Sequence, residues 1–451
     1  MTRKYFGTDG IRGRANTPPM TAYVAMKAAM AASIVLHQEG QHNRVVIGKD
    51  TRLSCYMLEQ AMASGFLAMG MEVMFTGPIP TPGVAFLTRS LRADLGVMIS
   101  ASHNPYQDNG IKFFGRNGYK LSDEIELQIE GLLQKELVEK YAPAEKMGRA
   151  YRIDDAAGRY VEYIKNTFPK NVSLKGKKIV IDCAHGAGYK VAPQILWELG
   201  ADIIKINVDP NGKNINDKCG ATDTKALQSS VVENGADLGV ALDGDADRLI
   251  MVDETGTRIN GDQLMALVGQ VWQDKGLLSK PAIVSTIMSN LGLERFLASK
   301  DIKLHRAKVG DRYVMEDMRA HDLNFGGEQS GHLIFSDYAT TGDGILAALQ
   351  ILAILQEHNM QASELTKIFT PVPQILQNVK YNRASDFSLE AEEIQNLLKQ
   401  AEETLSNDGG RLVVRPSGTE PLIRVMAEGD DEREVQKIVA DLCNQIESHA
   451  S

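Results

Sequence analysis

Short apolar runs rich in β-branched residues recur along the chain and predict strands. Val45–Ile47, Ile179–Ile181 and Ile283–Val284 are such runs. A helical pattern follows each run, and then a further strand-like stretch such as Glu72–Phe75 or Asp202–Ile206. Strands that alternate with helices form βαβ units, whose sheets are mostly parallel. The pattern therefore predicts a series of three α/β units.

Two of these units contain a strand that opens with the same five residues and then breaks into a polar loop. The segments Ala93–Pro105 and Ala236–Arg248 both begin A-D-L-G-V, and His321–His332 is a weaker echo of them. Ligands of parallel sheets gather outside the carboxyl ends of the strands, so these loops lie where chemistry is expected. The alternative is a chance resemblance between short apolar runs.

The C-terminal part has a different pattern. Thr370–Pro373 is typical of a linker, and a strand, a helix over Leu389–Leu405, two strands around a loop and a last helix follow it. The last helix places five apolar residues on one face: Val435, Ile438, Val439, Leu442 and Ile446. The sequence thus predicts three tandem βαβ-type α/β domains with mixed, mostly parallel sheets, and a C-terminal α+β domain. The expected boundaries are 1–153, 154–254, 255–369 and 370–451.

Charge and cysteine content narrow the class of protein. The 451 residues include 49 Lys and Arg against 58 Asp and Glu, and the net charge of -9 argues against nucleic acid as a partner. The four cysteines show no C-x-x-C spacing, which favours a reducing, cytoplasmic location. The apolar stretch Ala22–Leu36 is interrupted by Lys27 and is shorter than the roughly 20 residues that span a bilayer. It predicts a buried helix and no membrane partner.

Three carboxylates follow the second A-D-L-G-V strand on alternate residues, at Asp243, Asp245 and Asp247. Carboxylates held this close repel one another, and a hard divalent cation such as Mg²⁺ or Ca²⁺ relieves the repulsion. An EF-hand is excluded because Arg248 stands where its glycine belongs and because strands flank the loop. The alternative is a solvated acidic turn.

Ser102 lies in S-A-S-H-N-P, at the end of the first A-D-L-G-V strand. By itself this loop is more typical of a turn, since Ser, Asn and Pro are common turn residues. It becomes a candidate site because the matching loop carries the acidic residues. A phosphoryl group on Ser102 would bring roughly -1.5 to -2 charges, which a neighbouring metal would neutralise.

Three further loops offer polar groups. Glu328–His332, after two glycines, suits sugar hydroxyls but could equally be a capped turn. Arg415–Pro421, with Arg424 after it, can form an anion nest, or else a hairpin turn with a surface arginine. Phe6–Gly13 is a glycine-rich loop that holds Arg12 and lacks the ending of a Walker loop.

Taken in order, these loops resemble those of the α-D-phosphohexomutase superfamily. The resemblance runs from Gly7 to Pro421 and covers the N-terminal arginine loop, S-x-S-H-N-P, D-G-D-A-D-R, G-E-Q-S-G-H and R-P-S-G-T-E-P. Each motif is moderately specific by itself, whereas the ordered set is strongly specific. The resemblance implies four domains around a central cleft, each of which contributes one loop.

The resemblance also implies a role for each matched residue. Ser102 is expected to be the phosphoserine, and a phosphoserine oxygen would bind magnesium together with Asp243, Asp245 and Asp247. The sugar hydroxyls would be bound by Glu328 and Ser330. The non-reacting phosphate would be held by Arg415, Ser417, Gly418, Thr419 and Arg424. The transferring phosphoryl group would be steadied by Arg12 and Arg248, and Lys112 and His332 are candidate proton-transfer groups.

Within the superfamily the chain is most similar to the bacterial branch that acts on glucosamine phosphates and supplies amino-sugar nucleotide and cell-wall precursor synthesis. G-T-D-G-I-R-G, G-G-E-Q-S-G-H and Val309–Val314 carry this similarity. It implies interconversion of glucosamine 6-phosphate and 1-phosphate with one Mg²⁺ per chain and glucosamine 1,6-bisphosphate as primer. A homodimer is an expectation from the family. A glucose or mannose phosphate mutase and a metal-dependent phosphatase that uses the same serine remain alternatives.

Overall fold

The computed structural model describes residues 4–7, 9–36, 43–137, 140–381, 388–407, 409–416 and 422–450. Contacts divide the chain into two units, each of which is described by itself. The first unit comprises Met1–Thr286 and His305–Ile368, and the second comprises Ile287–Leu304 and Phe369–Ser451. Within the described part, no helix combines the length and the apolar character that crossing a membrane requires.

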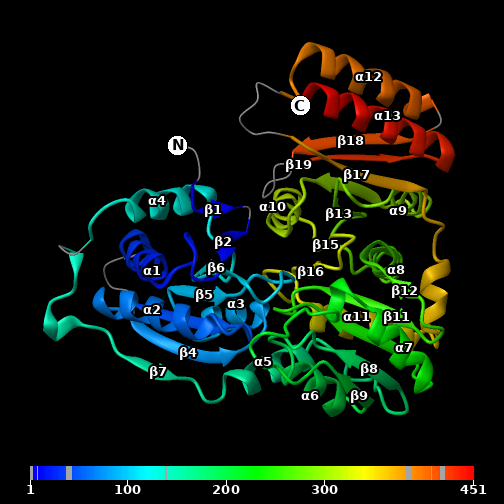
Figure 1. Cartoon of the computed structure of the whole chain (residues 1–451). Coiled ribbons are helices and arrows are strands. Elements are labelled where there is room, and N and C mark those ends of the chain that lie inside the picture. Colours follow the sequence, from blue (N-terminus) through cyan, green and yellow to red (C-terminus); the bar gives the residue numbers. More distant parts are fainter. Residues whose placement is uncertain are drawn as a thin grey trace. The chain divides into compact units, whose positions relative to one another are not determined.

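The first unit begins with a seven-stranded sheet in the order β1-β2-β6-β5-β3-β4-β7 (Figure 1). Its strands are β1 (Phe6–Gly7), β2 (Gly10–Arg14), β3 (Arg44–Lys49), β4 (Glu72–Pro78), β5 (Leu95–Ile99), β6 (Asp108–Gly115) and β7 (Ala150–Arg152). Its helices are α1 (Ala22–Leu36), α2 (Cys55–Ala68), α3 (Thr81–Ser90) and α4 (Asp123–Leu133). The buried helix predicted over Ala22–Leu36 is confirmed, and it packs against α2 and α4.

The alternation of side chains along β3 explains why helices cover both faces of this sheet. Val45 and Ile47 point into the core cluster that α1, α2 and α4 share. Gly48, on the other face, lies against Val84 of α3. A run of buried residues without polar alternation is typical of such a doubly covered, largely parallel strand.

The second sheet has five strands in the order β12-β11-β10-β8-β9. They are β8 (Lys178–Asp182), β9 (Asp202–Ile206), β10 (Leu238–Leu242), β11 (Leu249–Asp253) and β12 (Arg258–Ile259). The helices of this region are α5 (Ala156–Lys165), α6 (Val191–Glu198) and α7 (Lys225–Glu233). Leu227 and Val231 of α7 pack with Val180, Ala241 and Ile250 of the sheet.

The third sheet has the order β14-β13-β15-β16. Its strands are β13 (Ala282–Thr286), β14 (Lys303–Ala307), β15 (Phe325–Gly327) and β16 (Leu333–Phe335). The helices here are α8 (Gly261–Asp274), α10 (Asp311–His321) and α11 (Gly344–Glu357). The capping box of Asn260 and Gln263 fixes the start of α8, and Asp343 caps α11 through the backbone N–H groups of Ile345 and Leu346.

The three strands that precede the polar loops occupy the same place in their sheets. β5, β10 and β15 each lie between a parallel partner (β3, β8 or β13) and an antiparallel partner (β6, β11 or β16). The glycine of the A-D-L-G-V motif has the same function in β5 and in β10. A Cβ on Gly96 would lie 2.2 Å from Thr88 Oγ1 of α3, and one on Gly239 would lie 2.8 Å from Leu227 and Val231 of α7. The repeat seen in the sequence is therefore a structural repeat.

The second unit contains a three-stranded antiparallel sheet in the order β17-β19-β18. Its strands are β17 (Gln374–Lys380), β18 (Arg411–Pro416) and β19 (Leu422–Glu428), and its helices are α9 (Leu291–Ala298), α12 (Glu392–Asn407) and α13 (Glu432–Ala450). Val435, Val439, Leu442 and Ile446 of α13 are buried against the sheet, as their spacing predicts. The predicted class, α/β with mixed sheets and a C-terminal α+β part, is confirmed. The four domain boundaries stay predictions.

Candidate active site

The loop after β5 holds Ser102 in a left-handed backbone conformation with φ of 51°. The backbone N–H of Ser102 donates to Ser100 Oγ at 2.9 Å, and Ser100 Oγ donates to Asp50 Oδ2 at 2.6 Å. The carbonyl oxygen of Ser102 accepts hydrogen bonds from Arg52 at 2.8 Å and from Asn216 at 2.9 Å. Hydrogen bonds thus fix both the N–H and the carbonyl group of Ser102. A strained residue that is held in this way indicates a site whose function needs this backbone geometry.

The hydroxyl of Ser102 meets the acidic loop that follows β10. Ser102 Oγ donates to Asp243 Oδ2 at 2.7 Å, although 141 residues separate the two in sequence. Asp243, Asp245 and Asp247 are buried, and each offers a carboxylate oxygen within 4.8 Å of the others. Asp245 Oδ1 and Asp247 Oδ1 are buried and have no hydrogen-bond partner among the described residues. Buried, unsatisfied carboxylate oxygens of this kind fit a hard divalent cation.

The carboxylates of this loop differ in how well nearby positive charges balance them. Burial, followed by the charges of Asp247 and Asp245, raises the pKa of Asp243 well above its usual range. For Asp245, burial acts in the same direction but is outweighed by the charge of Lys112 and the hydrogen bond from Thr81, so that its pKa is lowered. The charge of Lys112 therefore compensates Asp245, whereas the charge of Arg248 does not outweigh burial and the two neighbouring carboxylates at Asp243.

Lys112 lies at the centre of the buried charges. Its Nζ is 2.9 Å from Asp245 Oδ2, 3.1 Å from Asp9 Oδ2 and 3.6 Å from Asp247 Oδ2. Burial lowers the pKa of Lys112, but the three carboxylates outweigh it and raise that pKa well above its usual value. The Lys112 side chain is therefore positively charged at neutral pH.

Arg12 and Arg248 bring two further cations to the same place. Arg12 pairs with Asp9, and the backbone N–H of Arg248 donates to Asp243 Oδ1 at 3.2 Å. The Nε atoms of both arginines are buried and without a partner in the part of the chain that the structure describes. Both guanidinium groups thus keep donors available for an anion.

His103, next to Ser102, has Nδ1 3.4 Å from the serine oxygen. Burial, followed by the charges of Arg248 and Arg12, lowers the pKa of His103 to about 3. Its imidazole is accordingly neutral at physiological pH. The sequence pattern gave no role to this residue, although it lies inside the serine motif.

The loop after β15 carries Glu328, Ser330 and His332. Glu328 accepts a hydrogen bond from the backbone N–H of Gly310 at 3.1 Å, and Ser330 Oγ donates to Glu328 Oε2 at 3.4 Å. His332 Nε2 lies 3.7 Å from Asp247 Oδ2 and 3.4 Å from Asp311 Oδ2. The three predicted residues therefore adjoin the acidic loop through His332.

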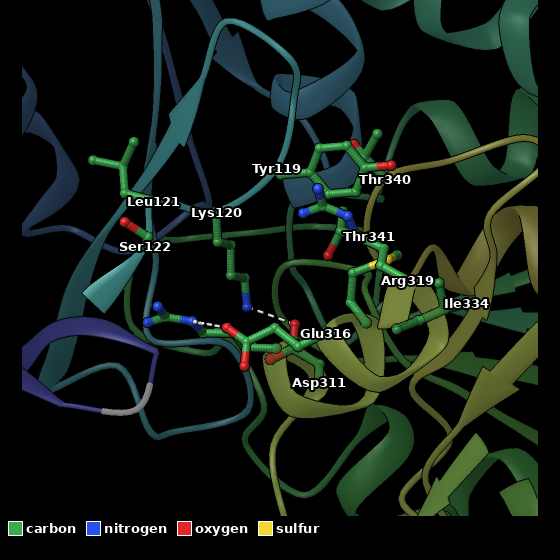
Figure 2. Close-up of a pocket in the computed structure, with 12 residues that line it drawn as sticks. Tyr119, Lys120, Leu121, Ser122, Asp311, Glu316, Arg319, Ile334, Thr340 and Thr341 are labelled. Carbon is green, nitrogen blue, oxygen red and sulfur yellow. Dashed lines mark hydrogen bonds and ion pairs between the residues drawn. The ribbon is translucent and has the colours of Figure 1, made fainter. Parts of the chain in front are cut away.

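Lys120 joins the N-terminal arginine loop to the start of α10. Its Nζ is 2.5 Å from both Asp9 Oδ1 and Asp311 Oδ2. Figure 2 shows the lysine extending toward Asp311 along one wall of a pocket that Tyr119, Arg319 and Thr341 also line. Asp9 in turn contacts Lys112. A continuous series of ion pairs thus runs from Lys112 through Asp9 and Lys120 to Asp311.

The phosphate-binding residues predicted in the second unit are only partly described. Arg415 of β18 and Arg424 of β19 are directly opposite each other in the sheet, and the Nε of each is buried without a partner among the described residues. Burial, followed by the charge of Arg424, lowers the pKa of Arg415. Two facing arginines whose charges repel each other fit an anion. Ser417, Gly418 and Thr419 lie outside the described residues.

The structure also adds residues that sequence reasoning missed. Asp50, Arg52, Thr81 and Asn216 contact the serine or the acidic loop directly or through one partner, and Lys120 is linked to the acidic loop through Asp9 and Lys112. None of them belongs to a motif with a recognisable spacing. Asp9 and Asp311 lie within segments that the sequence singled out. Each is an acidic residue close to an arginine, Arg12 or Arg312, and this could have identified them.

Profiles of known families match nearly the whole chain. Residues 3–140 match phosphoglucomutase/phosphomannomutase alpha/beta/alpha domain I, residues 158–256 match domain II, residues 260–372 match domain III and residues 376–445 match the C-terminal domain. The first match contains both the N-terminal arginine loop and the serine loop, and each of the other three contains one further candidate loop.

Similar solved structures support the same fold. A phosphoglucomutase/phosphomannomutase family protein from Burkholderia thailandensis has a TM-score of 0.81 at 22% identity, with 99% of this chain and 98% of that chain covered. An Aspergillus fumigatus N-acetylphosphoglucosamine mutase, solved in complex with GlcNAc-6P and magnesium, has a TM-score of 0.69 at 18% identity, with 100% and 96% covered. At these identities the likeness shows the fold alone.

Full-length relatives define the family more closely. The chain is 57% identical over 451 residues to a phosphoglucosamine mutase of Brucella ovis, with 100% of this chain and 99% of the relative covered. It is 56% identical over 446 residues to a phosphoglucosamine mutase of Mesorhizobium japonicum, with 99% and 98% covered. The chain belongs to the phosphoglucosamine mutase family, within the phosphoglucomutase/phosphomannomutase superfamily.

Proposed function

We propose that the protein interconverts glucosamine 6-phosphate and glucosamine 1-phosphate through a phosphorylated Ser102. The observation that carries this proposal is the contact of Ser102 Oγ with Asp243, at 2.7 Å, inside a buried cluster of three carboxylates and three cations. The names of the full-length relatives support the choice of sugar.

The serine oxygen acts as the carrier of the phosphoryl group. In the first half-reaction the bond between phosphorus and Ser102 Oγ breaks, and a bond forms from phosphorus to the free sugar hydroxyl, giving the 1,6-bisphosphate. After the intermediate turns over, its other phosphate returns to Ser102 Oγ. Transfer of this kind depends mainly on position and charge stabilisation.

The surrounding side chains perform this stabilisation. Arg12 and Arg248 offer buried guanidinium donors to the transferring group, and their unpartnered Nε atoms support this role. Lys112 keeps its proton because of Asp245, Asp9 and Asp247, so it can donate to the oxygen left on Ser102. His332, between Asp247 and Asp311, is positioned to accept the proton of the sugar hydroxyl.

The acidic loop would hold the metal. Asp243, Asp245 and Asp247 would bind Mg²⁺ together with a phosphoserine oxygen, and the unsatisfied Oδ1 atoms of Asp245 and Asp247 support this. When bound, Mg²⁺ withdraws charge from the oxygen that bridges Ser102 and phosphorus.

The remaining sites would hold the substrate. Glu328 and Ser330 would bind sugar hydroxyls, and Glu328 is already oriented by the N–H of Gly310. Arg415 and Arg424, with Ser417, Gly418 and Thr419, would hold the phosphate that does not react. We further propose glucosamine 1,6-bisphosphate as primer, a homodimer, and a cytoplasmic protein that supplies amino-sugar nucleotide and cell-wall precursor synthesis.

A substrate comparison tests the proposal. kcat/KM would be measured on glucosamine, glucose and mannose 6-phosphates with Mg²⁺ and a trace of the matching 1,6-bisphosphate, while free phosphate is assayed. We expect a preference for glucosamine above about a hundredfold, which equals roughly 2.7 kcal/mol, and no phosphate release. Equal or faster turnover of glucose or mannose phosphate would contradict the choice of sugar. Stoichiometric release of phosphate would contradict the mutase reaction itself.

A further inference from the structure

A second cluster of metal-ligating side chains lies away from the acidic loop. His305 on β14 and Asp317 and His321 on α10 place one ligand atom each within 4.8 Å of one another. Asp317 and His321 are four residues apart, so they share one face of the helix. The proposed reaction uses none of the three.

The arrangement within this cluster is compact. His321 Nδ1 lies 2.9 Å from Asp317 Oδ1, and the imidazole rings of His305 and His321 are 4.4 Å apart between centroids. Zinc bonds of roughly 2.0–2.2 Å to nitrogen and carboxylate oxygen place neighbouring ligand atoms about 3.3 Å apart in a tetrahedron. Small side-chain rotations would therefore bring the three ligands to one ion.

The chemistry of these ligands differs from that of the acidic loop. Three carboxylates suit Mg²⁺, whereas two imidazoles with one carboxylate suit a borderline transition cation, above all zinc. His305 and Asp317 are half-buried and His321 is exposed, so an ion can enter from solvent. We propose that His305, Asp317 and His321 bind one zinc-class cation per chain, with the fourth position open to water.

The location of the cluster gives such an ion a consequence for the active site. β14 ends at Ala307 and α10 begins at Asp311, so the two elements flank a short connection that contains Gly310. The N–H of Gly310 binds Glu328, and Asp311 binds Lys120 and adjoins His332. A cation held by His305 and α10 would restrain this connection at both sides, and we expect tighter substrate binding. That consequence rests on the proposed function, whereas cation binding does not.

Zinc binding can be measured directly by calorimetric titration of the full chain with Zn²⁺ in saturating Mg²⁺ and a buffer free of phosphate. The wild-type protein, His305→Gln, His321→Gln and, as a matched control, His358→Gln at an exposed histidine would be compared. We expect at least about tenfold weaker binding in the first two variants, since loss of even an outer-shell partner costs roughly 10–100-fold. The control should bind as the wild type does. Equal affinity in all four proteins would overturn the proposal.

Further measurements distinguish zinc binding at this site from zinc binding at the acidic loop and from unfolding of the variants. The same zinc event should persist in Asp245→Asn, and its loss there would assign the ion to the acidic loop and overturn the proposal. Cobalt substitution should give visible absorption that His321→Gln removes. Thermal unfolding midpoints measured in a chelator establish that the variants fold. Zinc should raise this midpoint for the wild type and for His358→Gln, but not for His305→Gln or His321→Gln. A lower KM with zinc would support the effect on substrate, and an unchanged KM would refute that effect while leaving the binding result intact.

Discussion

The loops after β5 and β10 follow strands with the same opening sequence but carry different chemistry. Both strands open with A-D-L-G-V, are buried throughout, and use their glycine for close contact with a helix. The β5 loop then presents a single hydroxyl, Ser102, on a strained residue. The β10 loop presents three buried carboxylates, and two of them have an oxygen without a hydrogen-bond partner among the described residues. The comparison shows that the strand fixes where a loop lies, whereas the loop residues decide what it can do.

The two loops also differ in the buried charge behind them. Behind the β5 loop, Asp50 is paired with Arg52 at 2.7 Å, and both side chains are fully buried. Behind the β10 loop, Asp343 accepts hydrogen bonds from Tyr160 and two backbone N–H groups but has no cation beside it in the described contacts. Burial raises the pKa of Asp343 to about 6. The negative charge of Asp50 is thus balanced by a buried cation, whereas Asp343 is stabilised by hydrogen bonds alone in the described contacts.

The largest effect is expected from removing the hydroxyl that distinguishes the β5 loop. Ser102→Ala should lower kcat by at least about 10³-fold, because water cannot replace a covalent carrier held in position. Ser100→Ala is the matched control. It loses the hydrogen bond from the Ser102 N–H and the one to Asp50 but keeps the carrier hydroxyl, and we expect a loss at least about tenfold smaller than that of the Ser102 variant. Near-normal turnover by the Ser102 variant would rule out the phosphoserine mechanism.

A smaller effect is expected from removing one charge of the β10 loop. Asp245→Asn should raise the Mg²⁺ concentration for half-maximal activity by roughly ten- to a hundredfold, since charged contacts contribute about 1.5–3 kcal/mol each. The measurement is initial rate against Mg²⁺ concentration. Asp50→Asn changes the buried carboxylate behind the β5 loop. As long as this variant folds, its Mg²⁺ dependence should equal that of the wild type. Superimposable Mg²⁺ curves for the wild type and Asp245→Asn would contradict the assignment.

The smallest effect concerns stability and pH. The pKa of Asp343 is about 6 in the folded chain against 3.8 as its ordinary value. Its contribution to stability is therefore fully present below about pH 4 and is lost as the pH rises through about 6. Asp343→Asn does not titrate and keeps a good helix cap. Relative to the wild type, we expect it to gain up to about 3 kcal/mol between pH 4 and pH 8.

Urea midpoints in a chelator, measured at both pH values, check this expectation. Asp50→Asn serves as the contrast, because it leaves the buried Arg52 uncompensated and should destabilise the protein by about 3–5 kcal/mol at pH 8. The prediction is wrong if Asp343→Asn and the wild type differ in free energy of unfolding by the same amount at both pH values. In that case folding does not raise the pKa of Asp343.

The sequence by itself determined the elements and the local motifs. The period of apolar residues predicts α1, α13 and the central strands, because burying one face requires that spacing. The acidic cluster was also predictable, since its carboxylates are on alternate residues of one loop. The pairing of the serine loop with the acidic loop was predicted from their shared strand motif and from the family resemblance.

The tertiary structure alone decided which distant side chains meet. Arg52 holds the carbonyl of Ser102, and Lys120 pairs with Asp311 across 191 residues of sequence. Nothing in the spacing of these residues indicates such contacts, and their burial becomes visible only when the sheets are assembled. The physical reason is that periodicity and turn chemistry act over a few residues, whereas the partner of a buried charge is set by which strands lie side by side.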